Sequence, residues 1–327
     1  MAEVNVDEQL LELSEGRVLA YAEGGEPSST EVVIFFHGVF GVGKVPTTTP
    51  PPLEERHVHC INPTLPGWGN SSSVPPHMTF HDYLYEVITA LLTHLHPNSE
   101  NLRLYIAGGS FGTVPAQMLY GAPYEKFPLG RHIAGLLLLA PFSPFHAHKE
   151  YNKCLTWPNY IMIGRPGYLL PFKLIPRIAL LGMKGKVDTR EHAEKFIHEF
   201  AFAKMTPVER ELCEQWKAKR GIKDGEEGKD LADMIYRSVQ KTWDGFLALP
   251  SITHSGWGGY SPADLDEEHA KPVLIVLSHN DWEMKKMGEW LGSQLKSSHV
   301  RYEEGGHIAG MFVMDDIWQD FFSRIPQ

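Results

Sequence analysis

The sequence predicts an α/β fold in which a mostly parallel central sheet is covered by helices on both faces. The first observation is a set of short runs that are apolar on both faces, as in a sheet covered on both sides; they span residues 32–36, 102–109, 133–140 and 272–278. The second is that such runs alternate with segments of helical periodicity, an order typical of parallel α/β sheets. The third is that 43% of the 327 residues are hydrophobic, enough for a substantial core.

The first half of the chain supplies the early elements in order. Residues 10–25 are expected to form two short strands joined by a tight turn, and further strands are expected at 32–36 and 57–62. The strand at 102–109 is followed by a helix expected from Phe111. Each strand is bounded by Gly or Pro, the residues that most often interrupt regular structure.

Between the fourth and fifth strands, residues 79–97 change to a helical period. Thr79 and Asp82 resemble a capping pair at the start of this helix, and Pro97 is expected to end it. The apolar residues recur at spacings of three and four, which places them on one face of a helix. These residues are Leu84, Val87, Ile88, Leu91, Leu92 and Leu95.

The alternation stops after the sixth expected strand. Residues 148–250 contain mostly helical patterns and loops, including one helix expected over 231–249. We therefore expect a core formed by residues 1–147 and 251–327, with residues 148–250 inserted as a helical cap. The core then resumes with a strand, a helix, a strand and a final helix, expected at 272–278, 284–295, 299–304 and 312–325.

Composition narrows the functional classes. The net charge is −10 and no run of Lys or Arg occurs, which argues against a nucleic-acid partner. Three scattered cysteines and no C-x-x-C pair argue against a disulfide framework and a structural zinc site. The acidic first residues lack the order of a signal peptide, and no stretch of 18 apolar residues could span a bilayer. The expected location is therefore cytoplasmic.

One stretch resembles a nucleotide site. Gly38, Gly43 and Lys44 match G-x-x-x-x-G-K after an apolar strand, the position of a phosphate-binding loop. Val45 stands where Ser or Thr should ligate magnesium, and the four prolines that follow prevent a helix from binding phosphate. We therefore expect no nucleotide here, and Lys44 is expected to be a solvated loop residue.

The stretch G-G-S-F-G at 108–112 lies between an apolar strand and an expected helix. This is the pattern of a nucleophile elbow, a sharp turn that projects a serine hydroxyl above the sheet. Gly108 and Gly112 would let the strand and helix approach closely, because they lack a Cβ atom. Ser110 is therefore the predicted nucleophile, and the Phe111 N–H is a predicted donor to an oxyanion.

An acid and a base are expected later in the chain. Asp281 follows the strand at 272–278, with Glu283 as a nearby competitor, and His307 follows the last strand between glycines. Asp281 would orient the imidazole of His307, which would take the proton of Ser110. The 17 histidines make any single one weak evidence.

Two histidine pairs raise the alternative of a metal site. His57 and His59 have the spacing of one strand face, and His146 and His148 form a second pair. No third ligand is apparent near either pair, so we expect no metal, and the proposed chemistry needs no cofactor.

With these residues in the order Ser110, Asp281, His307, the sequence resembles the α/β-hydrolase fold superfamily with a helical cap domain. The resemblance covers the core and rests on the stretches "FFHGVFG", "PTLPGWGNSS", "YIAGGSFGTVPAQ", "PVLIVLSHND" and "GGHIAG". It implies that the loop after the first "HG" completes an oxyanion hole. By position, the Val39 N–H would pair with that of Phe111, and Phe40 is the neighbouring alternative.

The expected function is a serine hydrolase that cleaves a carboxylic ester, lactone or thioester through an acyl-enzyme. Alternatives are C–C bond hydrolysis, acyl transfer or lyase chemistry on the same fold, or a non-catalytic ligand-binding protein. Residues 157–184 are apolar, aromatic and rich in proline, so they could roof a pocket for a hydrophobic small molecule or simply pack against the core. Contact with a membrane surface ranks last, because prolines 166, 171 and 176 interrupt a long amphipathic helix.

Overall fold

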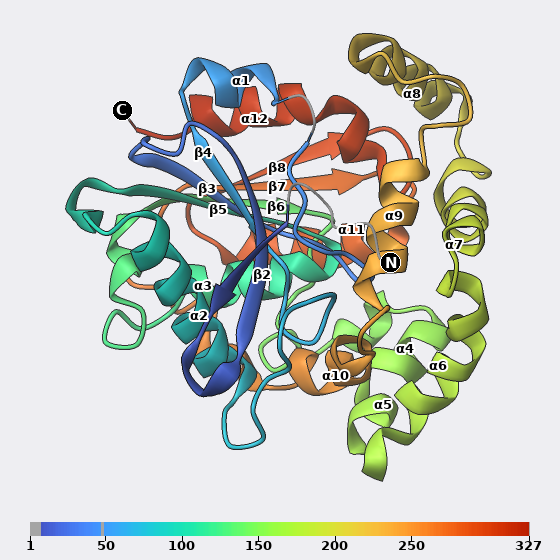
Figure 1. Cartoon of the computed structure of the whole chain (residues 1–327), viewed down its shortest axis with the longest axis horizontal. Coiled ribbons are helices and arrows are strands. Elements are labelled where there is room, and N and C mark those ends of the chain that lie inside the picture. The colour runs from blue at the N-terminus through green and yellow to red at the C-terminus, as the bar shows by residue number, and fades with distance from the viewer. Residues whose placement is uncertain (1–7, 47–48, 327) are drawn as a thin grey trace.

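The computed structural model describes residues 8–46 and 49–326. They form one eight-stranded sheet in the order β1-β2-β4-β3-β5-β6-β7-β8 (Figure 1). Strand β2 pairs antiparallel with both β1 and β4, and the other neighbours pair parallel, so the predicted fold class is confirmed. The strands are β1 (Gln9–Glu12), β2 (Val18–Gly25), β3 (Glu31–Phe36), β4 (His59–Pro63), β5 (Arg103–Gly109), β6 (Ile133–Leu139), β7 (Val273–Ser278) and β8 (Ser298–Glu303).

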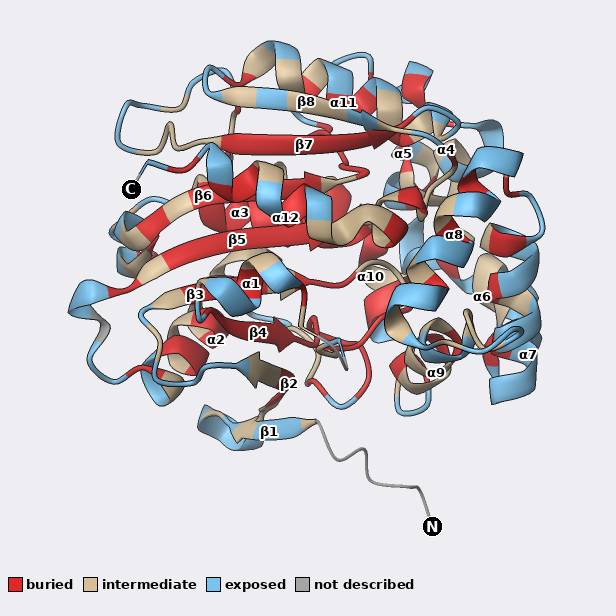
Figure 2. Cartoon of the chain, turned by 90° about the horizontal axis from the view of Figure 1, so that it is seen from above, coloured by how far each residue is buried: buried red, intermediate tan, exposed pale blue. Residues whose placement is uncertain are grey.

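The sheet has a hydrophobic core on each face, which explains why its central strands are apolar without alternation. In β7, Val273 and Ile275 pack into one core while Leu274 and Val276 pack into the other. Every residue of β7 is buried, as the central strands in Figure 2 show. Side chains of successive strand residues point to opposite faces, so a strand covered on both sides has no polar face.

Helices from the core segments cover the two faces. The larger core contains residues of α2 (Phe80–Leu95), α3 (Thr113–Tyr120) and α11 (Trp282–Gln294). The smaller core contains residues of α1 (Pro51–Glu55) and α12 (Met314–Ser323). In α2 the Thr79 hydroxyl accepts from the Asp82 N–H, and the predicted apolar face is buried apart from its half-buried last residue. The start and the buried face predicted for this helix are confirmed.

The chain between β6 and β7 forms seven further α-helices, which lie together at one end of the sheet (Figure 2). They are α4 (Trp157–Ile163), α5 (Arg165–Leu169), α6 (Leu174–Val187), α7 (Arg190–Ile197), α8 (Pro207–Arg220), α9 (Lys229–Ser238) and α10 (Asp244–Thr253). Within residues 8–46 and 49–326, no helix combines the length and apolarity needed to cross a bilayer.

The single helix predicted over 231–249 is wrong, because the chain breaks between α9 and α10. Gly69 N–H donates to Ser238 O at 2.8 Å, and Gly245 N–H donates to Gly67 O at 2.8 Å. A Cβ atom on Gly245 would lie 2.3 Å from Trp68 Nε1. The loop carrying Trp68 therefore binds backbone groups on both sides of the break, which a continuous helix would use internally.

Candidate active site

The three predicted catalytic residues follow three strands at one edge of the sheet. Ser110 comes directly after β5, while Asp281 and His307 lie in the segments that follow β7 and β8. These strands and the intervening β6 are parallel, and the last residues pair between β5 and β6 and between β7 and β8. Because the carboxyl ends of parallel strands share one edge, the fold brings all three residues to that edge, where ligands bind in open α/β sheets.

Ser110 occupies a sharp turn between β5 and α3. Its φ is 52°, a left-handed conformation that non-glycine residues rarely adopt. A Cβ atom on Gly108 would lie 2.3 Å from Gly112 O, and one on Gly112 would lie 2.1 Å from Phe36 O. Both separations are far below van der Waals contact, so the predicted need for two glycines here is confirmed.

Two polar side chains that sequence reasoning missed hold this turn in place. The Thr113 hydroxyl donates to Ser110 O at 2.6 Å and accepts from the Phe142 N–H at 3.1 Å. The buried Gln117 amide donates to Thr113 O and to Phe142 O, each at 2.9 Å. These bonds tie the turn to the loop after β6. The only signal in the sequence was a polar residue within an otherwise apolar helix.

Asp281 and His307 are joined by a short hydrogen bond. His307 Nδ1 lies 2.5 Å from Asp281 Oδ2, and the side chains are 29% and 11% exposed. With Nδ1–H donated to the carboxylate, Nε2 is the nitrogen left to accept a proton. Asp281 Oδ1 also accepts from the Met284 N–H at 3.4 Å, capping α11. Among the hydrogen bonds of the described residues, none joins Ser110 Oγ to His307.

Glu283, the competing acid, has different partners. Its carboxylate accepts from the Thr156 N–H and from Asn159 Nδ2, the latter at 2.7 Å. It therefore binds the start of α4, and Asp281 is the carboxylate that contacts His307.

The loop after β3 touches the predicted nucleophile. A Cβ atom on Gly38 would lie 3.2 Å from Ser110 Cβ and 3.8 Å from Ser110 Oγ, so a side chain would crowd the serine. Phe40 has a φ of 59° in this loop, which marks a second strained residue. In the described part of the chain, neither the Val39 N–H nor the Phe111 N–H donates to a protein acceptor in a turn or loop. Val39 follows Gly38 and Phe111 follows Ser110, so both predicted oxyanion donors adjoin this contact.

His37 holds this loop through both ring nitrogens. The Leu65 N–H donates to Nε2 at 2.9 Å, which leaves Nδ1–H to donate to Gly38 O at 2.7 Å. A Cβ atom on Gly41 would lie 2.6 Å from Nδ1, so glycine lets the loop fold against the ring. Burial lowers the pKa of His37 to about 4, because a charged imidazolium would lose its hydration.

This buried histidine predicts a loss of stability in acid. In the unfolded chain His37 has its ordinary pKa of 6.5, so it binds a proton as the pH falls below that value, whereas in the folded protein it binds a proton only near pH 4. The contribution of His37 to the free energy of unfolding is therefore complete above pH 6.5 and is lost as the pH falls. Between pH 7 and pH 5 the expected loss is about 2 kcal/mol. Urea unfolding at both pH values measures it, and His37→Gln should show a smaller loss; an identical loss in both proteins would contradict the assignment.

Lys44, expected to be solvated, is instead paired, so that expectation is wrong. Its ammonium lies 2.8 Å from Asp230 Oδ1 of α9, and its side chain is only 17% exposed. Its carbonyl accepts from Asn62 Nδ2 at 2.5 Å. The segment that resembles a phosphate-binding loop is therefore held to α9 through Lys44.

Glu209 of α8 reaches the loop that carries His307. It is 3% exposed, and its Oε1 accepts from the Gly306 N–H at 3.0 Å. Gly305 has a φ of 117°, and a Cβ atom there would lie 2.6 Å from Glu209 Cδ. The same carboxylate accepts from the Thr206 N–H, completing a capping box at the start of α8. An inserted helix thus fixes the backbone next to the predicted base.

Aromatic rings connect His307 to the loop after β3. Phe200, in the helical turn 198–202, meets the His307 ring at a centroid distance of 6.1 Å and 74°. Phe200 stacks on Phe196 at 6.1 Å, and Phe196 lies 6.4 Å from Phe40. Phe40 continues into contacts with Trp68, Trp243 and Phe246. These residues form an apolar wall beside the candidate site.

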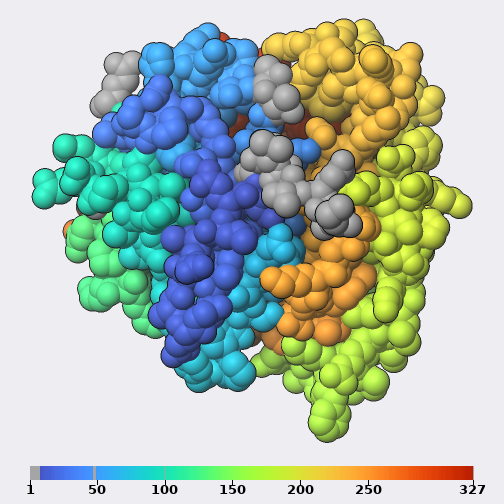
Figure 3. Space-filling model, viewed as in Figure 1, coloured from blue at the N-terminus to red at the C-terminus, as the bar shows by residue number. Residues whose placement is uncertain are grey.

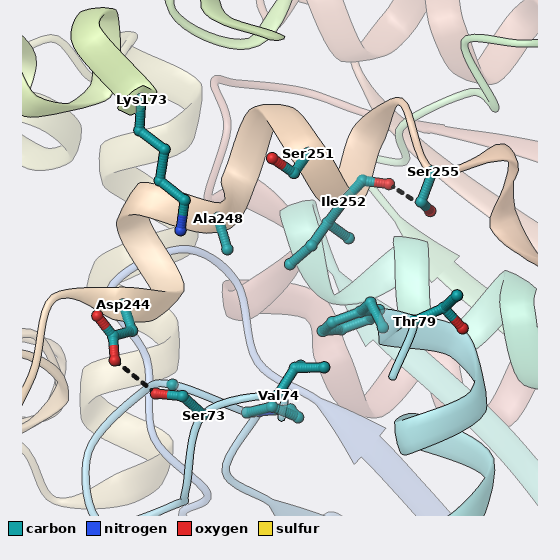
Figure 4. Close-up of a pocket in the computed structure, with 12 residues that line it drawn as sticks. Ser73, Val74, Thr79, Lys173, Asp244, Ala248, Ser251, Ile252 and Ser255 are labelled. Atoms are coloured by element: carbon teal, nitrogen blue, oxygen red, sulfur yellow. Dashed lines mark hydrogen bonds between the residues drawn. The ribbon is translucent and has the colours of Figure 1, made fainter. Parts of the chain in front are cut away.

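A separate cavity of about 540 Å³ lies between α10 and the loop at 66–80 (Figure 4). Ser73, Asp244 and Ile252 are among the residues that line it, and Ser73 donates to Asp244 at 2.6 Å. None of the three predicted catalytic residues lines this cavity.

Members of both histidine pairs form hydrogen bonds within the protein. The sequence suggested that His57 and His59 share a strand face, and this prediction is wrong. His57 is exposed and precedes β4 with a φ of 53°, so it is not part of the strand. His59 lies 2.9 Å from both His96 and Glu23. In the other pair, His146 meets a backbone carbonyl and His148 meets Ser143. Over the described ranges, no group of three acidic, histidine or cysteine side chains has the arrangement of a metal site.

Several known protein structures have a similar architecture. The chain is similar to an epoxide hydrolase from Vigna radiata, at 15% identity and a TM-score of 0.60 over 97% of this chain and 96% of that one. It is also similar to an α/β hydrolase enzyme from a Medee basin deep-sea metagenome library, at 15% identity and a TM-score of 0.59 over 98% of each chain. A thermophilic esterase from Thermogutta terrifontis matches at 15% identity and a TM-score of 0.52 over 97% of each chain.

At such low sequence identity, the structural similarity establishes the fold and does not identify the substrate. No curated protein sequence matches the chain. A family model described as the alpha/beta hydrolase family, however, matches residues 33–322, which is most of the sequence. Together with the hydrolases among the similar structures, this match supports a hydrolase acting on a small-molecule substrate. The chain belongs to the alpha/beta hydrolase family.

Proposed function

We propose that this protein is a serine hydrolase that cleaves a carboxylic ester, lactone or thioester of a hydrophobic small molecule. The observation that carries the proposal is the 2.5 Å bond between His307 and Asp281, at the sheet edge where Ser110 sits in a strained turn. A base oriented by a buried carboxylate beside a projecting serine is the arrangement used for acyl transfer.

In the proposed reaction, His307 Nε2 takes the proton of Ser110 as Oγ attacks the carbonyl carbon. Asp281 holds Nδ1–H and stabilises the imidazolium. The Phe111 N–H and the Val39 N–H, or that of Phe40, would stabilise the tetrahedral oxyanion. The imidazolium then protonates the leaving group. Water, deprotonated by the same nitrogen, hydrolyses the acyl-enzyme and restores Ser110.

The apolar wall supports the substrate class. Phe200 and Phe196 come from the insertion and Phe40 from the core, so the wall spans both parts of the chain. An acyl chain lying along it would replace water at the exposed Phe200 ring and the partly exposed Phe196 ring, a favourable burial of apolar surface. In this proposal, residues 148–250 act as a cap that helps to enclose the substrate.

A panel of esters and lactones tests the function on purified protein. Esters of increasing acyl length, with one common leaving group, should show kcat/KM rising with chain length, because longer chains cover more of the wall. A fluorophosphonate probe should label the protein, since only an activated serine reacts. Failure to label and failure to turn over any member of the panel would together refute a serine hydrolase.

Variants of Glu209 can distinguish an effect on the position of His307 from an effect on the stability of α8. Glu209→Ala should lower kcat roughly 10- to 100-fold, because the Gly306 backbone loses its partner and His307 shifts. Glu209→Gln retains an oxygen acceptor and should retain most activity. Thr206→Ala weakens the same capping box without touching Gly306, so it is the matched control. Equal kcat values for Glu209→Ala and Thr206→Ala would show that the carboxylate acts only on the helix.

A further inference from the structure

The outer surface of the insertion exposes an unusual share of large apolar side chains. Of the 13 exposed large hydrophobic residues in the described chain, seven lie between residues 168 and 181. They are Tyr168, Leu169, Leu170, Phe172, Leu174, Ile178 and Leu181. Isolated exposed apolar residues are common in soluble proteins, whereas a concentration of them marks an interaction site.

Helix α6 shows that this exposure follows a helical face. Leu174, Ile178 and Leu181 are 48%, 57% and 76% exposed, and their spacing of four and three residues aligns them along one face. Pro176 and Val187, on the opposite side of the helix, are buried. The helix therefore packs with one apolar side and presents a second apolar stripe outward.

The turn before α6 extends this stripe. Phe172 is 83% exposed, and it and Lys173 both have left-handed backbone angles, with φ of 59° and 54°. Two consecutive strained residues that expose a phenyl ring are costly for the isolated chain. Figures 1 and 3 show this green to yellow-green segment at the rim of the molecule, away from the blue amino-terminal strands.

The stripe is bordered by positive charge. Arg177 and Lys184 each follow an exposed leucine of the stripe by three positions, so they lie along one flank. No Asp or Glu occurs from 157 to 187, although the whole chain carries a net charge of −10. Among the described residues, Lys173, Arg177, Lys184 and Lys186 form no ion pair.

We propose that this face, defined by Phe172, Leu174, Arg177, Ile178, Leu181 and Lys184, docks on an anionic lipid bilayer surface. Apolar side chains would enter the boundary between headgroups and acyl chains, while the flanking cations would meet lipid phosphates. A second copy of the chain fits less well. In a twofold dimer the same patch would face itself and place its unpaired cations opposite one another.

The prolines that disfavoured this reading in the sequence do not disrupt the face. Pro166 and Pro171 lie at the starts of α5 and of the following turn. Pro176 lies in the first turn of α6, where the missing N–H has no helical partner to lose. Fourteen residues of α6 therefore remain helical, and the prolines only divide the segment into short pieces.

Vesicle flotation tests the proposal on the whole chain. The protein should float with vesicles of phosphatidylcholine and phosphatidylglycerol and should remain unbound with phosphatidylcholine alone. The double variants Phe172→Ser/Leu181→Ser and Arg177→Glu/Lys184→Glu should each weaken binding to the anionic vesicles by at least about tenfold. The matched controls, Leu10→Ser and Lys296→Glu, remove an exposed apolar residue and an exposed cation outside the face and should bind as the wild type does.

Circular dichroism and thermal melting should show that all variants remain folded. The proposal is overturned if the wild type does not float, or if the face variants float as well as it does. It is also overturned if the wild type binds no vesicles and instead forms a dimer that the face variants dissolve. The substituted side chains are not part of the apolar wall proposed to contact the substrate, so turnover of water-soluble esters should not change in the face variants and the result is independent of the proposed chemistry.

Discussion

Replacing Ser110 with alanine is expected to reduce kcat for any ester that the wild type hydrolyses by roughly 10⁵- to 10⁶-fold. In the proposed mechanism the variant lacks the oxygen that attacks the carbonyl carbon, so the acyl-enzyme cannot form. Fluorophosphonate labelling should disappear at the same time. Folding should be retained, because the neighbouring Thr113 and Gln117 bond to backbone groups and not to the Ser110 hydroxyl.

The matched control for this change is Ser293→Ala. Ser293 is exposed on α11, and its hydroxyl donates to Trp290 O and accepts from Gln294 Nε2, both close by in the chain. This variant should keep full labelling and full turnover, which shows that the loss at position 110 is specific. Wild-type turnover in Ser110→Ala would mean that another residue carries the reaction.

Replacing Asp281 with asparagine is expected to lower kcat about 10⁴-fold while leaving the protein almost as stable. One carboxylate oxygen accepts from His307 Nδ1 and the other caps α11. Asparagine caps helices as well as aspartate does, so the cap survives. Its amide, however, no longer offers the negative charge that, in the proposed mechanism, orients and stabilises the imidazolium. Steady-state kinetics and urea unfolding measure the two effects separately.

Two further variants test whether Asp281 or Glu283 is the carboxylate that acts on His307. Asp281→Ala removes both roles, so it should lose activity as Asp281→Asn does and should also lose about 1 kcal/mol of stability. Glu283→Gln changes the competing acid, which binds Thr156 and Asn159 and does not contact His307. It should retain turnover. A large loss in Glu283→Gln, with activity kept in Asp281→Asn, would reverse the assignment.

Local chemistry made much of the fold predictable. The eight strands and the core helices follow from apolar periodicity and from caps within a few residues, such as Thr79 with Asp82. The elbow was also predictable, since Gly108 and Gly112 can be recognised from a five-residue pattern. These features depend on interactions within one element or between an element and its neighbours in the chain.

Features that depend on distant partners were not predictable in this way. Residues 231–249 look like one helix until the loop carrying Trp68 binds at both sides of the break. Lys44 looks solvated until Asp230 lies beside it, and Glu209 resembles an ordinary capping residue until it meets Gly306. Each partner is too far along the chain for any local pattern to connect the pair.

The sequence by itself therefore determined the class of fold, the position of the predicted nucleophile and the order of its predicted partners. Backbone dihedral preferences and the period of apolar side chains depend only on residues that are close together in the chain, so they can be recognised from the sequence. Only the tertiary structure decided that Asp281 and not Glu283 reaches His307, and that the insertion supplies Glu209 and Phe200 beside it. Those contacts exist because parallel strands bring distant segments to one edge, and the packing of the inserted helices selects which side chains meet there.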